Sequence, residues 1–144
     1  MNRRPRKLVH AAIIVLVVTS LVATEEIADY RHESMEAIGG HFQSLLKIVR
    51  GEVPFDSHIS MHADALADYG EIMGSLFPDG SEGGEALDKI WEEPDEFKKA
   101  VEAFKTATAD LKETVDDDGS ESDIGSAVRE VGMACRGCHN KYRE

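Results

Sequence analysis

The sequence lacks most of the residue combinations on which enzyme active sites and metal centres depend. With only two cysteines in 144 residues, it has no second cysteine pair to complete a structural zinc site. No histidine lies in an HExxH motif, and we find no Ser/His/Asp set and no phosphate-binding glycine loop. Nothing in the sequence indicates a substrate-converting active site, so we expect that the protein is not an enzyme.

Long apolar runs are also missing. The longest, at 11–23, has about 13 residues, whereas a transmembrane helix needs roughly 20. It follows ten residues that carry four cations and no acid, and it ends in the small residue Ala23, which is typical of a secretory signal peptide. We predict a signal peptide over 1–23 and one domain over 24–144. An uncleaved membrane anchor is the less favoured alternative.

Basic residues are scarce beyond the signal segment. Residues 24–144 contain all 28 carboxylates but only 12 of the 16 lysines and arginines, so their formal charge is −16. A surface of this charge repels nucleic acid and anionic membranes. It favours a partner with a basic or mixed surface, although the carboxylates can equally well serve only to keep the surface solvated.

Apolar residues recur at helical spacing throughout the domain, and no segment alternates apolar and polar residues as a strand would. The pattern predicts four helices, over 25–50, 57–76, 94–115 and 123–142, with a short helical piece at 86–91. Gly51 is suited to end the first helix, and the segment 77–84 is rich in turn residues. The predicted fold is all-α, an antiparallel up-down-up-down four-helix bundle.

Several positions within these helices carry specific expectations. The buried stripe of the first helix is expected to comprise Ile27, Tyr30, Ser34, Met35, Ile38, Phe42, Leu45, Leu46 and Val49. Gly39 and Gly40 indicate close approach by a neighbouring helix or a bulky ligand. Asp56 or Ser57 is suited to cap the second helix. Thr108 is the polar member of an apolar stripe, and its hydroxyl is expected to bond to the carbonyl one turn earlier.

The two cysteines lie in the motif Cys135-Arg136-Gly137-Cys138-His139, near the end of the fourth predicted helix. This spacing is the attachment signature of c-type haem, in which both thiols join the vinyl groups and the imidazole binds the iron. Positions i, i+3 and i+4 of a helix share one face, so Cys135, Cys138 and His139 are expected to face the same planar ligand.

Other uses of these residues fit the sequence less well. A thioredoxin-like redox pair lies at a helix N-terminus, where the dipole lowers a thiol pKa, whereas this pair lies near a C-terminus. Residues three apart in a helix rarely reach disulfide geometry. His58 and His62, one turn apart, could bind a metal, but a solvated or half-buried pair is the more common arrangement. A bundle without haem, acting as a structural or adaptor domain, is the remaining alternative.

Essentially the whole of 24–144 resembles the class II c-type cytochromes, the family of cytochrome c′ and its low-spin relatives. In that family the haem motif lies at the end of the last helix of the bundle. The most specific similarity is this motif together with Tyr142-Arg143. Weaker similarities occur at Tyr30-Arg31 with Met35, His41-Phe42, the run from Val49 to Asp56, and Ile90-Trp91 before Pro94. The resemblance implies one covalent haem c with its iron, and a periplasmic location, because such haem is attached outside the bacterial plasma membrane.

The resemblance also implies roles for individual residues. Cys135 and Cys138 would form the thioether links, and His139 would be the proximal iron ligand. Arg143 matches a basic residue beside the proximal face that interacts with bound diatomic gas. Arg31 matches a residue that approaches a haem propionate, although a surface ion pair is an equally common use of such an arginine.

Met35 matches the distal residue that covers the sixth iron site, and its role decides between two functions. In the low-spin branch of the family a methionine sulfur there binds the iron, which raises the reduction potential. The resemblance then implies an exported carrier that transfers single electrons to a redox partner, the function we favour. In the high-spin branch the side chain only blocks the site, and the implied alternative is a cytochrome c′ that binds nitric oxide or carbon monoxide. The resemblance also allows a homodimer through the first two helices.

Overall fold

The computed structural model describes the backbone from Lys7 to Glu144 and the side chains from Thr24 onward. Its α-helices and 3-10 helices (η) follow in the order α1 (Lys7–Val49), η1 (Asp56–His58), α2 (Ile59–Ile72), η2 (Met73–Leu76), α3 (Lys89–Glu92), α4 (Pro94–Asp116) and α5 (Glu121–Tyr142). The residues described here form isolated β-bridges but no strand, as the sequence predicts.

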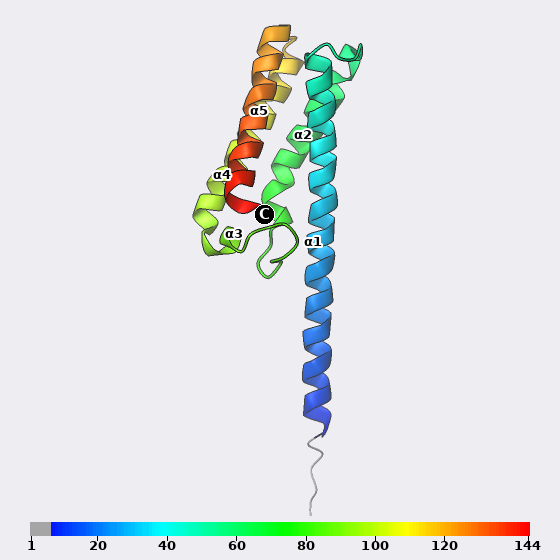
Figure 1. Ribbon diagram of the computed structural model, residues 1–144, viewed down its shortest axis with the longest axis vertical. Coiled ribbons are helices and arrows are strands. Elements are labelled where there is room, and N and C mark those ends of the chain that lie inside the picture. Colours follow the sequence, from blue (N-terminus) through cyan, green and yellow to red (C-terminus); the bar gives the residue numbers. More distant parts are fainter. Residues whose placement is uncertain (1–6) are drawn as a thin grey trace, which may run out of the picture.

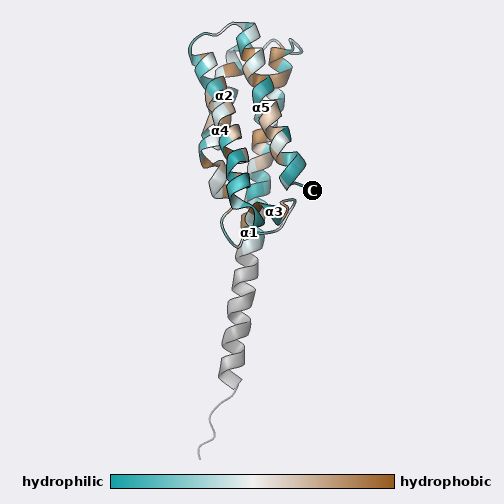
Figure 2. Ribbon diagram, turned by 90° about the vertical axis from the view of Figure 1, so that its left-hand side faces the viewer, coloured by the Kyte–Doolittle hydropathy of each residue, from teal (hydrophilic) through white to brown (hydrophobic). Residues whose placement is uncertain are grey.

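The prediction of an all-α antiparallel four-helix bundle is confirmed. Each of the long helices α1, α2, α4 and α5 packs against the next, and α1 also contacts α5 to close the bundle (Figure 1). Of these four interfaces, the one between α1 and α5 is the least extensive. Figure 2 shows hydrophobic and hydrophilic residues on different faces of the same helices, as expected for amphipathic helices around a core.

Helix α1 begins earlier than the sequence predicts. Its expected start was near Glu25, whereas the helix runs from Lys7. The chain has no proline or glycine between Lys7 and Ile38, so no residue in this stretch breaks the helix. The predicted signal peptide, 1–23, lies outside the residues whose side chains are described, and it stays a prediction. Within the described part of the chain, no helix is both long and apolar enough to span a bilayer.

The other helix ends follow the sequence in most cases. Gly51 ends α1 with φ of 68°, and its N–H donates to the carbonyl of Ile48 at 2.8 Å. Pro94 begins α4, where its missing N–H costs no helix hydrogen bond. The prediction that Asp56 or Ser57 caps the second helix is wrong, because both residues belong to η1 and no side chain caps α2.

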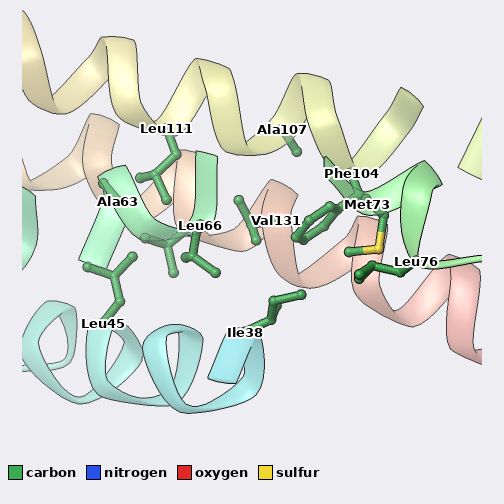
Figure 3. Packing of buried hydrophobic residues seen from close by; sticks show 11 residues of the cluster. Ile38, Leu45, Ala63, Leu66, Met73, Leu76, Phe104, Ala107, Leu111 and Val131 are labelled. Carbon is green, nitrogen blue, oxygen red and sulfur yellow. The ribbon is translucent and has the colours of Figure 1, made fainter. Parts of the chain in front are cut away.

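Side chains from all four long helices meet in the core (Figure 3). The main cluster consists of Ile38, Leu45, Ala63, Leu66, Met73, Leu76, Phe104, Ala107, Leu111, Val128 and Val131. One position of the predicted stripe is wrong: Tyr30 is 63% exposed, whereas its neighbour Arg31 is only 5% exposed. At this turn of α1, the guanidinium of Arg31 is therefore buried, whereas the phenol of Tyr30 is exposed.

The segment 77–88, between η2 and α3, is the long irregular connection that the sequence predicts, and it pairs with the C-terminus. The N–H of Leu87 donates to the carbonyl of Tyr142 at 3.0 Å. The N–H of Glu144 donates to the carbonyl of Glu85, also at 3.0 Å. The last turn of α5 is therefore held against this connection rather than left free.

Helices α2 and α4 approach each other most closely at Gly70. A Cβ added to Gly70 would clash with Oγ1 of Thr108 and lie 3.3 Å from Cα of Lys105. The Thr108 hydroxyl is fully buried and donates to the carbonyl of Phe104 at 3.0 Å, as the sequence predicts. The glycine therefore allows an approach that any side chain would prevent.

Replacing Gly70 with alanine should lower the free energy of unfolding by about 1–2 kcal/mol, because the overpacked methyl displaces the Thr108 hydroxyl. This figure already includes the gain of about 1 kcal/mol that alanine brings over glycine through its higher helix propensity. Urea denaturation measures the change. Gly74→Ala is the matched control, since its added Cβ would meet only Cγ1 of Val101 at 3.7 Å. Equal urea midpoints for the two variants would contradict the close α2–α4 contact.

Candidate functional site

A large cavity lies along the interface between α1 and α5. Its volume is about 1400 Å³. The two helices come close from the start to the middle of α5, where a Cβ added to Gly125 would lie 3.5 Å from Cγ1 of Val49 and one added to Gly132 would lie 3.0 Å from Cζ of Phe42. In Figure 1, α5 leans away from α1 towards the C-terminus. On the α1 side, Gly39 and Gly40 line the cavity with no atom within 4 Å of an added Cβ. Of the two explanations that the sequence suggests for these glycines, the structure favours space for a ligand over contact with a helix.

The predicted haem motif lies on the α5 wall of this cavity. Cys135, Cys138 and His139 all line it from the last two turns of the helix, as the i, i+3, i+4 spacing predicts. Both cysteines are partly buried free thiols and do not form a disulfide. The motif thus presents two sulfur atoms and one imidazole to the same space.

Burial shifts the pKa values of these three groups in the direction that favours their uncharged forms. Desolvation raises the pKa of the Cys138 thiol to about 11, and the neighbouring Cys135 adds to this rise. The pKa of Cys135 is also raised by burial. A thioredoxin-like pair would need a lowered thiol pKa, so the raised pKa values disfavour this alternative. Burial, and then the charge of Arg143, lower the pKa of His139, which favours the neutral imidazole that binds metals.

Met35 lies on the opposite wall of the cavity, on α1. Its side chain is partly buried and packs against the main core cluster. The structure therefore brings Met35 and His139 to the same cavity from two different helices. A ligand between the helices would have the imidazole on one side and the thioether on the other.

Arg31 is the most unusual residue of the cavity wall, because its charge is buried. Its guanidinium donates to the carbonyls of Leu76, Ser81 and Gly83 at 3.3, 3.1 and 2.8 Å. It also lies against the ring of Phe77, 5.1 Å from the centroid. Desolvation by burial lowers its pKa. The alternative of a surface ion pair is wrong, since no carboxylate among the described residues pairs with it.

Arg143 also lines the cavity, at the end of α5. Its guanidinium forms an ion pair with Glu85 at 2.5 Å, and both side chains are about half exposed. Its backbone forms a β-bridge with Ala86. The residue thus joins the motif helix to the connection that surrounds Arg31.

The histidine pair that the sequence suggests as a metal site forms differently in the structure. Nδ1 of His62 lies 3.0 Å from Nδ1 of His41 on α1, while the ring of His58 stacks on Phe55. The part of the chain that is described contains no cluster of three or more metal-binding side chains. The i, i+4 spacing could not show this contact, because it comes from a different helix.

The cavity fits a haem. One wall offers the two thiols and the imidazole, and most of the cavity surface is apolar. Arg31 supplies a buried cation without a described counter-ion, as a haem carboxylate requires. The hydroxyl of Tyr142 is buried without a hydrogen-bond partner and also lines the cavity. Sequence reasoning missed this hydroxyl, and it missed that Arg50, Arg129 and Arg136 line the cavity as well.

Comparison with known proteins agrees with this assignment. The family model described as Cytochrome C' matches residues 26–143. Cytochrome c′ of Pararhodospirillum photometricum is 33% identical over 83% of this chain and 98% of its own length. Cytochrome c-554 of Cereibacter sphaeroides is 31% identical over 83% and 82%.

A solved structure gives the same result for the fold. A ferrous variant of cytochrome c′ from Alcaligenes xylosoxidans with bound nitric oxide superposes with a TM-score of 0.78 and 27% identity, over 84% of this chain and 95% of that one. Another variant from the same organism is carbon monoxide bound, with the same TM-score and 28% identity over 84% and 96%. With the two thiols and the histidine on one cavity wall, these matches establish that the chain belongs to the cytochrome c′ family and is a c-type cytochrome that transfers electrons through a covalently bound haem.

Proposed function

We propose that Cys135 and Cys138 hold the haem through thioether links and that His139 is its proximal iron ligand. The support is the common position of the three side chains on the cavity wall formed by α5. When bound, the haem supplies a one-electron ferric–ferrous couple. The lowered pKa of His139 favours the neutral imidazole that ligation requires.

Arg31 would bind a haem propionate. Four of its hydrogen bonds, to carbonyls and to the Ser81 hydroxyl, come from Nη1 and Nη2. A guanidinium has five N–H donors, so its Nε–H and one Nη2–H remain for a carboxylate. A buried cation is stabilised most by a nearby anion, and the described residues supply none. Arg143 would lie beside the proximal face, tethered by Glu85.

The remaining cavity wall would keep water away from the site. Ile38, Val101 and Phe104 line it with apolar groups, and Ile38 and Phe104 belong to the main core cluster. A dry, rigid surrounding keeps the reorganisation of solvent small when an electron arrives or leaves. The chain would therefore act as a carrier between redox proteins, without a substrate-converting site.

Met35 decides between this role and gas binding. We favour a sulfur ligand, which suits an electron carrier. The relatives with bound nitric oxide or carbon monoxide support the second candidate, in which Met35 only restricts access to the iron. In that case Arg143 would lie on the proximal side of the haem and interact with the bound gas.

Replacing Met35 with alanine should broaden the α-band of the reduced protein and make it respond to nitric oxide, because the thioether ligand is lost. Reduced-minus-oxidised absorbance spectra with and without nitric oxide measure this. Met133→Ala is the matched control, since Met133 is 47% exposed on α5 and does not line the cavity. A wild-type spectrum that is already broad and shifts with nitric oxide would refute ligation by Met35 and support the gas-binding candidate.

Replacing Arg31 with glutamine should destabilise the haem-loaded protein by about 2–4 kcal/mol, because buried carbonyls lose their donors. It should also lower the reduction potential, since removing a cation beside the site favours the oxidised form. Urea denaturation and redox titration measure the two effects. Arg50→Gln, at an arginine whose side chain is 61% exposed, should change stability by less than about 0.5 kcal/mol. Lost stability with an unchanged potential would show that Arg31 serves only the fold.

We also propose that residues 1–23 direct export and are removed, leaving 24–144 as the periplasmic domain. Haem attachment to a C-x-x-C-H motif supports this location. The partner would be a redox protein, and the net charge of the domain disfavours nucleic acid. A homodimer through α1 and α2 remains part of this proposal by resemblance to the family.

A further inference from the structure

The cations of the domain are distributed unevenly. All five arginines whose side chains are described line the cavity between α1 and α5, and none of the seven lysines does. The arginines are Arg31, Arg50, Arg129, Arg136 and Arg143. The basic residues of the cavity wall are therefore all arginines, although the domain contains both arginine and lysine.

Three of these arginines form a row along α5 and the residue that follows it. Arg129 and Arg136 are spaced seven residues apart, close to two helical turns, and Arg143 follows seven residues later, just after the end of α5. All three line the cavity together with Cys135 and His139. Arg143 is paired with a carboxylate through its contact with the connecting segment. Arg129 and Arg136 are exposed and form no ion pair with any carboxylate that the structure describes. These two charges are available to a partner.

The charge of the cavity wall is opposite to that of the rest of the domain. The wall holds five arginines and three carboxylates, Asp29, Glu36 and Glu85, with histidine counted as neutral. Outside it, the domain has seven lysines and 25 carboxylates. At 0.1 M ionic strength the Debye length is about 10 Å, so a docking partner senses the nearby charges far more than the distant ones.

The choice of arginine points to the chemistry of that partner. A guanidinium binds a carboxylate through two parallel hydrogen bonds, and it is less strongly hydrated than an ammonium group. Arginine is accordingly enriched in protein interfaces, where lysine is depleted. A row of unpaired arginines beside a redox site is thus suited to carboxylates on a protein surface.

We propose that Arg129 and Arg136 form a docking surface for a redox partner that presents carboxylates, although the domain as a whole is acidic. The inference rests on the proposed electron-transfer function. The net charge of the domain favours a partner with a basic or mixed surface, whereas this inference predicts a partner that is acidic at the contact. Electrons would then leave or enter along the α5 side of the cavity.

The first test measures binding without electron transfer. Fluorescein-labelled poly-L-glutamate is titrated with the haem-loaded protein at 0.1 M ionic strength, where the Debye length is about 10 Å. We expect saturable binding that Arg129→Glu and Arg136→Glu each weaken about tenfold. Lys98→Glu is the matched control: it changes the net charge equally, at an exposed position on α4 away from the cavity. It should leave the affinity within about twofold. No binding by the wild type, or equal losses in all three variants, would overturn the inference.

The second test follows electron transfer to small oxidants of opposite charge. Ferricyanide takes one electron from the reduced protein and becomes ferrocyanide, and tris(phenanthroline)cobalt(III) is the cationic counterpart. If the arginine row acts as proposed, the ferricyanide rate falls as salt is raised above 0.1 M, and Arg136→Glu lowers it about tenfold at 0.1 M. A rate that rises with salt would mean that net charge governs the encounter, and the inference would be wrong. Failure of both oxidants would refute electron transfer itself, while the poly-L-glutamate titration would still decide the docking surface.

Discussion

The incomplete packing between α1 and α5 is the constraint on which the rest of the structure depends. This interface is the least extensive of the four in the bundle, and it contains a cavity of about 1400 Å³ with mostly apolar walls. Protein interiors are otherwise packed as densely as organic crystals, and an empty apolar cavity costs stability in proportion to its volume. A haem attached to α5 would fill this space, so the cofactor serves the fold as well as the chemistry.

The long connection between η2 and α3 links the two walls of the cavity. Arg31 of α1 is bonded to its Ser81 and Gly83, and farther along the same connection Ala86 pairs with Arg143 at the end of α5. The distal and proximal sides are thereby joined through one segment of backbone. We therefore expect a substitution of Arg31 to affect helix α5 through this segment, even without direct contact between the two.

Much of the fold and the core of the site could be predicted from the sequence, because local patterns determine them. Helical periodicity gave the four helices, and the C-x-x-C-H spacing placed Cys135, Cys138 and His139 on one face. The errors concern features that other parts of the chain decide. Whether Tyr30 or Arg31 faces inward depends on the connecting segment that supplies carbonyls to the guanidinium, and no pattern within α1 contains that information.

The arginine row illustrates a different limit. The seven-residue spacing of Arg129, Arg136 and Arg143 is visible in the sequence, but net charge alone favoured a partner with a basic or mixed surface. Only the position of the cavity shows that these cations are gathered around it. Average charge is a property of composition, whereas docking depends on the charges within a Debye length of the contact.

The central claim is that a haem is fixed covalently to α5 through Cys135 and Cys138. Mass spectrometry of the intact exported protein, combined with reaction of the denatured chain with a thiol reagent, tests it most directly. We predict a mass equal to that of the polypeptide plus one haem, and no reactive thiol. A mass equal to that of the polypeptide alone, with two thiols that react, would contradict the account.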